Sequence, residues 1–186
     1  MPGLLAGGAG MALILLRHTR PDVATGLCYG RTDLALAGDF ADTAADLARD
    51  LPPFRRILCS PLSRCRRLAQ ALAAARALPL TVDPRLIEMD FGAWEGRPWS
   101  DLPRVELDAW AADLLHARPH GGETVAELAA RTDAALAAAR RGAVPALLVT
   151  HAGVIKAALA ARDGPAAWKA EIAFGSWCHI DAEVAR

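Results

Sequence analysis

Two histidines and two arginines stand at or near the ends of apolar runs that have the length of buried strands. Arg17 and His18 follow the first run, Arg64 lies a few residues beyond the second, and His151 follows the fourth. Forked guanidinium donors suit a dianionic phosphoryl group, and a neutral imidazole nitrogen can attack phosphorus directly. These residue types predict a site that transfers a phosphoryl group through a phosphohistidine.

The leaving oxygen of a phosphate ester also needs a proton, and Glu88 is the candidate donor. A carboxyl that is partly buried near the phosphate could donate this proton and then accept one from water. Other carboxylates follow closely, among them Asp90, Glu95 and Asp101. Spacing alone therefore leaves open the alternative that Glu88 is a surface carboxylate.

A fold that alternates strands with helices must position these residues. The apolar runs predict strands at 12–16, 57–59, 80–82 and 146–150, and an alternating pattern predicts an edge strand at 176–180. Periodicity and capping signals predict helices at 39–51, 60–77, 107–116, 124–142 and 154–162. This order predicts an α/β fold, a three-layer sandwich with a mostly parallel central sheet flanked by helices.

The predicted helix starts matter for the chemistry. Ser60 is the expected cap of one helix, with Pro61 in its first turn, and Thr124 and Glu127 form a capping box for another. Ligands of parallel sheets sit beyond the carboxyl ends of the strands. We therefore expect the amides that follow Ser60 and His151 to face the bound phosphate.

Composition narrows the function classes. The 186 residues carry no net charge, although residues 1–76 hold ten basic and six acidic residues. This balance argues against a nucleic-acid partner, and no apolar run is long enough to span a membrane. The four cysteines lack metal-ligand spacing and fit reduced thiols in the cytoplasm. The expected partner is a small phosphorylated substrate, and the sequence predicts no cofactor and no metal.

One domain is expected at 12–186, after an N-terminal extension at 1–11 that lacks the features of a signal peptide. Within this domain, residues 88–120 are rich in Trp, Gly, Pro and acids and have weak periodicity. We predict that they form an irregular, lid-like excursion.

The chain resembles the histidine phosphatase superfamily, which has the phosphoglycerate mutase-like fold. The resemblance rests on Leu-Leu-Arg-His-Thr-Arg-Pro at 15–21 and Ser-Pro-Leu-Ser-Arg-Cys at 60–65, together with the motifs at 29–36, 86–96, 121–124 and 149–155. These motifs occur in the family's order over nearly the whole chain.

The resemblance implies roles for individual residues. His18 would be the phosphorylated nucleophile, Arg17 and Arg64 would clamp the phosphoryl oxygens, and His151 would donate to them in the transition state. Glu88 would be the proton donor and then the base for the hydrolytic water.

The chain departs from the family pattern beside the nucleophile. Thr19 stands where the family usually has glycine, and the polar residues that often help to bind phosphate do not follow it. Thr19, Arg20 or Arg31 could take their place, with a solvated loop arginine as the alternative. The chain also lacks room for the extra segments of mutases, which favours hydrolysis.

Within the superfamily, the residues at 28–34, 92–96 and 175–178 are similar to the α-ribazole phosphatase branch. That branch removes the 5′-phosphate of α-ribazole phosphate in cobalamin biosynthesis. Trp94 and its aromatic neighbours could stack on the flat base, or could simply pack the excursion onto the core. Glu123 could reach the site through its loop, or could complement a helix dipole.

Three alternative functions remain open at this point. The first is a broad phosphatase of sugar phosphates or nucleotides, and the second is a phosphoglycerate mutase. The third is an inactive relative that binds phosphorylated ligands.

Overall fold

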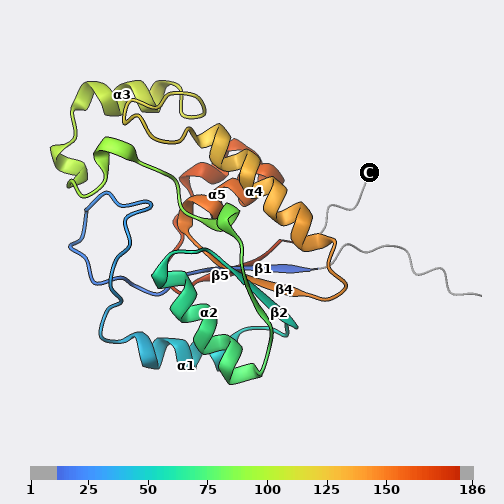
Figure 1. Ribbon diagram of the computed structural model, residues 1–186. Helices are drawn as coiled ribbons and strands as arrows, with labels where there is room; N and C mark the ends of the chain where they lie inside the picture. The colour runs from blue at the N-terminus through green and yellow to red at the C-terminus, as the bar shows by residue number, and fades with distance from the viewer. Residues whose placement is uncertain (1–11, 181–186) are drawn as a thin grey trace, which may run out of the picture.

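The computed structural model describes residues 12–180, so the predicted extension at 1–11 lies outside the described residues. Its sheet has the strand order β3-β2-β4-β1-β5, and only β5 runs antiparallel to its neighbour (Figure 1). The strands are β1 (Leu13–Arg17), β2 (Arg56–Cys59), β3 (Leu80–Val82), β4 (Ala146–Thr150) and β5 (Trp177–Ile180). The predicted mostly parallel sheet with an edge strand near the C-terminus is confirmed.

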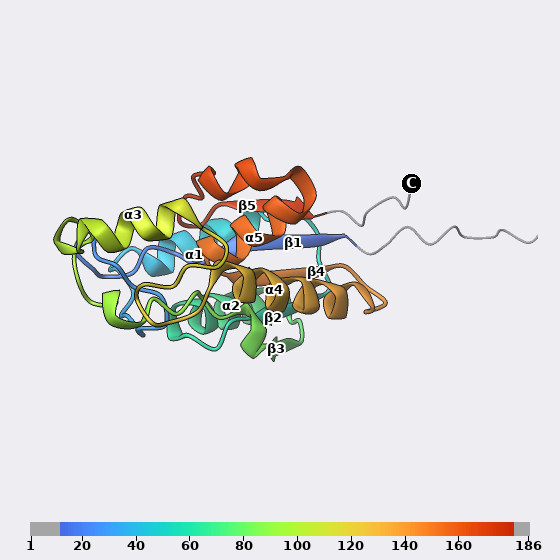
Figure 2. The ribbon, with the colours of Figure 1, turned by 90° about the horizontal axis from the view of Figure 1, so that it is seen from above.

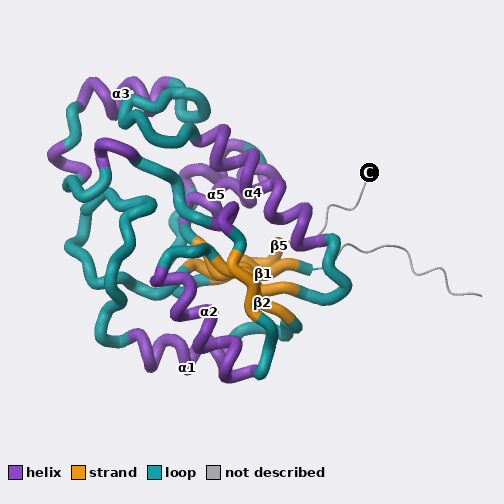
Figure 3. Tube along the Cα trace, viewed as in Figure 1, coloured by secondary structure: helices purple, strands orange, loops and turns teal. Residues whose placement is uncertain are grey.

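Helices cover both faces of this sheet (Figure 3). They are α1 (Phe40–Asp50), α2 (Ser63–Arg76), α3 (Arg104–Ala112), α4 (Val125–Arg140) and α5 (Ala152–Asp163). Alternate side chains of β1 enter opposite cores, because successive residues of a strand point to opposite faces. Leu13 and Leu15 pack with α4 and α5, whereas Ile14 and Leu16 pack with α1 and α2. This explains why the strand is apolar throughout.

The start of α2 differs from the prediction. The helix begins at Ser63 and not at the Ser60-Pro61 pair, because Leu62 is extended. The Ser63 amide and hydroxyl both donate to the Asp33 carboxylate, at 2.9 and 2.7 Å. A carboxylate from a distant loop therefore occupies this helix N-terminus, and its first amide is not available to a phosphate.

The other helix ends follow local signals more closely. The capping box of Thr124 and Glu127 is present at the start of α4. In contrast, α3 begins several residues before the predicted helix at 107–116, directly after Pro103. A proline suits a helix start because its φ angle is already helical, and this signal outweighs the weak apolar periodicity of the segment.

The stretch between β3 and α4 carries most of the irregular structure. Besides α3, it contains the short 3-10 helices η1 (Pro84–Leu86), η2 (Gly92–Trp94) and η3 (Trp99–Asp101). Figure 2 shows α3 beyond the carboxyl ends of the parallel strands. The excursion therefore lies next to the sheet edge where a ligand is expected.

Within the described residues, no helix is long and apolar enough to cross a membrane.

Candidate active site

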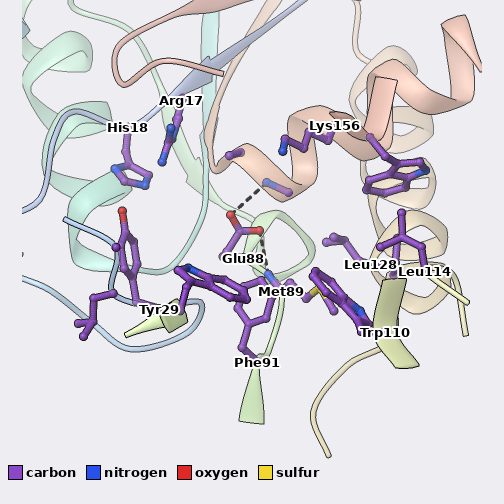
Figure 4. Close-up of a pocket in the computed structure, with 17 residues that line it drawn as sticks. Arg17, His18, Tyr29, Glu88, Met89, Phe91, Trp110, Leu114, Leu128 and Lys156 are labelled. Atoms are coloured by element: carbon purple, nitrogen blue, oxygen red, sulfur yellow. Dashed lines mark hydrogen bonds between the residues drawn. The ribbon is translucent and has the colours of Figure 1, made fainter. Parts of the chain in front are cut away.

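A pocket of about 490 Å³ opens at the carboxyl ends of the central strands. Arg17, at the end of β1, and His18 line it at one side, and Glu88 lies between them and a group of apolar side chains (Figure 4). The walls beyond Glu88 come from the excursion, from α4 and from α5 and the turn after it. The pocket therefore has a polar side next to His18 and an apolar side under the excursion.

His18 is held as a neutral imidazole. Its side chain is buried, and Nδ1 donates to the main-chain oxygen of Thr19 at 2.7 Å. Burial and, to a smaller extent, the nearby charges of Arg64 and Arg17 lower the pKa of His18 to about 3, against the opposing effect of the Thr19 hydrogen bond. With the proton on Nδ1, the lone pair is on Nε2. This is the form of imidazole that can attack phosphorus.

His151 lies beside His18, with ring centroids 5.1 Å apart. It is fully buried, and burial together with the nearby His18 and Arg64 holds its pKa well below the ordinary value. Its Nε2 is 2.7 Å from the Ser60 hydroxyl and 3.4 Å from the Cys65 sulfur. The strand ends β1, β2 and β4 thus bring together residues that are far apart in sequence.

Arg64 is fully buried although it stands in the first turn of a helix. Its two Nη atoms donate to the main-chain oxygens of Thr32 and Gly30, at 2.8 and 2.6 Å. Its Nε has no hydrogen-bond partner among the described residues. Burying a cation at a helix N-terminus costs free energy unless an anion compensates it.

Arg17 shows the same features. One Nη donates to the Ile172 carbonyl, the guanidinium carbon lies 3.7 Å from the centroid of the Phe174 ring, and Nε has no partner within residues 12–180. The Thr19 hydroxyl is likewise buried and without a partner in that range. Unpaired buried donors around one imidazole point to an anionic ligand.

Glu88 is tied to the start of α5. One carboxylate oxygen accepts from the Met89 amide at 2.9 Å, and the other accepts from the Gly153 amide at 3.1 Å (Figure 4). The amide that was expected to face phosphate after His151 therefore binds Glu88 in this structure. A Cβ at position 153 would clash with the Glu88 carboxylate, so only glycine there leaves the carboxylate in this position.

Comparison with known proteins agrees with this geometry. The family model of the histidine phosphatase superfamily, branch 1, matches residues 13–185. The protein belongs to this superfamily. The resemblance and the phosphoglycerate mutase-like fold expected from the sequence are thereby confirmed.

This histidine phosphatase is similar to several phosphatases of named activity. An adenosylcobalamin/alpha-ribazole phosphatase of Salmonella typhimurium is 32% identical over 183 residues, which cover 92% of this chain and 90% of the relative. The crystal structure of the alpha-ribazole phosphatase from Shigella flexneri has a TM-score of 0.80 and 31% identity, covering 94% of this chain and 92% of that one. A glucosyl-3-phosphoglycerate phosphatase of Mycobacterium tuberculosis is 32% identical over 80% of this chain and 74% of its own. These names support the prediction of a phosphoric monoester hydrolase.

The structure of this histidine phosphatase places Arg20, Arg31 and Glu123 outside the pocket lining, and Thr19, Arg64 and His151 are not part of that lining either. Arg20 is exposed and pairs with Asp39 at 3.0 Å. Arg31 lies 3.4 Å from Glu123, which is also paired with Arg131 at 2.6 Å. Ion pairs with Asp39, with Asp90 and with Arg131 of α4 engage the side chains of Arg20, Arg31 and Glu123, so their contact with the substrate stays a prediction.

For Trp94, the structure agrees with the alternative that it packs the excursion onto the core. Its side chain is fully buried, its indole nitrogen donates to Glu106 at 2.7 Å, and it packs with Cys28 and Leu102. It does not line the pocket, whereas Trp99 and Trp110 do. The aromatic motif therefore divides into a buried anchor and a partly buried pocket wall, which sequence periodicity does not distinguish.

Sequence reasoning missed four residues near the site. Tyr29, Lys156 and Trp168 line the pocket, and Phe174 packs against Arg17 and lies 5.5 Å from the His18 ring. Tyr29 is the only tyrosine of the chain and stands in a motif that supports the resemblance, so it could have been found. The others are single residues in helices or loops and carry no local signal.

We predict that acid destabilises this histidine phosphatase because of its buried neutral histidines. The unfolded chain binds protons at His18 and His151 below their ordinary pKa of 6.5, whereas the folded protein does not until about pH 3 for His18. Stability present above pH 6.5 is therefore lost as the pH falls toward 3, by up to about 1.4 kcal/mol per pH unit for each histidine. Urea unfolding at pH 7 and pH 5 measures this loss.

The variant His18→Asn should lose less stability than the native protein between these two pH values. His116→Asn is the matched control, because His116 is exposed and should leave the loss unchanged. An equal loss in His18→Asn and the native protein would show that His18 is not buried as a neutral group.

Proposed function

We propose that the protein hydrolyses phosphate monoesters through a phosphohistidine formed on His18. Nε2 of His18 attacks phosphorus while the ester bond to the leaving oxygen breaks, and Glu88 gives that oxygen its proton. Arg17, Arg64 and His151 stabilise the charge on the transferred phosphoryl group. Glu88 then takes a proton from water, the water attacks phosphorus, and the bond to Nε2 breaks to release phosphate.

The neutral Nε2 of His18, surrounded by buried guanidinium donors, is the observation that carries this proposal. A nucleophile must keep its lone pair, and the Thr19 carbonyl fixes the proton on the other nitrogen. The Gly153 amide holds Glu88 at the wall of the same pocket. Both groups needed for ester cleavage therefore face one cavity.

The substrate that we propose is α-ribazole 5′-phosphate, as part of cobalamin biosynthesis. The named relatives support this choice. The apolar side of the pocket also supports it, because Phe91, Trp99, Trp110 and Trp168 offer a surface for a flat benzimidazole base. A sugar phosphate has no group that would benefit from this surface.

The test is a comparison of kcat/KM for α-ribazole 5′-phosphate and ribose 5-phosphate. These two esters share the leaving oxygen and differ in the base, so the ratio reports what the apolar side contributes. Trp110→Ala should lower kcat/KM for α-ribazole 5′-phosphate by about 10-fold or more, and that for ribose 5-phosphate much less, because a base stacked on an aromatic ring gains about 1–3 kcal/mol.

Trp177→Ala is the matched control, since Trp177 lies partly exposed on the edge strand and does not line the pocket. Equal kcat/KM values for the two esters in the native protein would refute the proposed substrate. They would leave the proposed chemistry at His18 in place.

A third experiment addresses the proton donor. Glu88→Gln should lower kcat/KM for an alkyl phosphate by about 100-fold, within the usual range for loss of a general acid. The loss with p-nitrophenyl phosphate should be small, because p-nitrophenol departs as the anion without a proton. Gly153→Ala should show the same dependence on the leaving group, since its methyl group would displace the Glu88 carboxylate.

Gly142→Ala gives a comparison for Gly153→Ala. A Cβ at position 142 would also meet a side chain, that of Arg56, but far from the pocket. It should not discriminate between the two esters. An equal loss of both esters in Glu88→Gln would exclude Glu88 as the acid.

We also infer a cytoplasmic location and a small-molecule substrate with no nucleic acid or membrane as partner. All four cysteines are free thiols, and disulfides are rare in the cytoplasm. The balanced charge of the chain supports the absence of a nucleic-acid partner.

A further inference from the structure

We propose that Arg131 and Glu123 form an ion pair that positions Glu88 for proton transfer. This proposal rests on the proposed function, in which Glu88 is the general acid. Glu88 lies between the short helices η1 and η2, in a segment with no regular hydrogen-bond ladder of its own. Its main chain must therefore be held by contacts from elsewhere in the fold.

Arg131 supplies three of those contacts. It projects from α4, and its guanidinium donates to the main-chain oxygens of Arg85, Ile87 and Glu88 at 2.6, 2.5 and 3.0 Å. Only 17% of its side chain is exposed. One planar group thus fixes three carbonyls at and just before the proposed acid.

Glu123 completes the arrangement on the other side of Glu88. Its two carboxylate oxygens accept from Nε and Nη2 of Arg131 at 2.6 and 2.9 Å, and one of them also lies 3.4 Å from the Asp90 amide. The Arg131–Glu123 pair therefore holds the main chain before and after Glu88. The two side chains bind each other and the main chain around Glu88, so the pair acts through Glu88 and not on the substrate.

The geometry requires an arginine. The fork of the guanidinium bonds a carboxylate bidentately with one edge and main-chain carbonyls with the remaining N–H groups, which a lysine ammonium cannot reproduce. Glu123 balances the charge, because an unpaired buried cation would be costly. A loosened segment would let the Glu88 carboxyl drift away from the leaving oxygen.

How the loss in kcat/KM depends on the leaving group distinguishes a loss of Glu88 positioning from a general loss of active-site structure. Arg131→Met should lower kcat/KM for an alkyl phosphate by about 10-fold or more, because small displacements of a catalytic group have effects of up to about 100-fold. The value for p-nitrophenyl phosphate should fall much less. Arg131→Lys should restore little, and Glu123→Gln should give the same pattern with a smaller change.

Arg85→Met is the matched control. Arg85 also joins this segment to α4, through the Ala134 carbonyl at 3.1 Å, but its side chain does not contact Glu88 or Glu123. This variant should change the thermal midpoint without discriminating between the esters. The thermal unfolding midpoint of each variant shows whether it folds. If Arg131→Met does not fold, Glu123→Gln, which preserves the shape of the side chain, tests whether the ion pair positions Glu88.

The decisive measurement is a double-mutant cycle with Glu88→Gln. In that background, Arg131→Met should cost less than about 2-fold with the alkyl phosphate, because its effect passes through the missing acid. The same loss in both backgrounds would overturn the positioning role. If Glu88→Gln itself lowers both esters equally, the proposed acid fails and this proposal fails with it.

Discussion

Replacing His18 by asparagine is expected to lower kcat by at least about 10⁴-fold, as loss of a covalent nucleophile does in other enzymes. Asparagine has nearly the shape of the imidazole near Cβ but offers no basic nitrogen to phosphorus. Phosphate release measures the loss. Acid-labile, base-stable phosphoprotein, trapped by rapid denaturation during turnover, should form on the native protein and not on the variant.

His116→Asn serves as the control here as well, because its imidazole is exposed and pairs with Asp113 at 3.1 Å in the excursion. Its turnover and its phosphoprotein should match those of the native chain. Turnover by His18→Asn at the native rate would remove the nucleophile from the proposal. It would leave the family and the fold untouched.

The strands β1, β2 and β4 could be predicted from the sequence because they are buried on both faces. β1 and β4 are continuous apolar runs for this reason, and a turn or helix signal bounds each run. The parallel order then follows from the helices between the strands. Since ligands of such sheets lie at the carboxyl ends, the same reasoning predicts that His18, Arg64 and His151 gather at one edge of the sheet.

Local signals failed where a distant residue takes part. Ser60 looks like a helix cap, yet its hydroxyl lies against His151, and Asp33 from another loop meets the amide at the true helix start. In the same way, Glu123 carries the charge expected at a helix start, but its carboxylate is engaged by Arg131. Neither contact has a signature in the residues around it.

The aromatic residues of the excursion show a second reason why the site could not be predicted fully from the sequence. Trp94 and Trp110 are the same residue type in the same excursion, yet one is an anchor and the other a pocket wall. Which of them faces a ligand depends on how the segment folds back onto Cys28 and Leu102. Weak periodicity therefore predicts the presence of an excursion but not the direction of its side chains.

Arg64→Ala is expected to cost on the order of 3–5 kcal/mol in transition-state stabilisation, because a preorganised charged donor in a buried site is worth about this much. Unlike Glu88, Arg64 acts on the phosphoryl group and not on the leaving oxygen. The loss in kcat/KM should therefore be the same for an alkyl phosphate and for p-nitrophenyl phosphate.

The folded state should also lose stability, since the carbonyls of Gly30 and Thr32 would lose their donors. Arg67→Ala is the control for the loss of one positive charge from this helix, because Arg67 lies on its exposed side. Free guanidinium at millimolar concentration should restore part of the activity of Arg64→Ala at a temperature where the variant is folded. A loss of less than about 10-fold would contradict the clamp, because a charged donor to a phosphoryl group in a buried site contributes more than that.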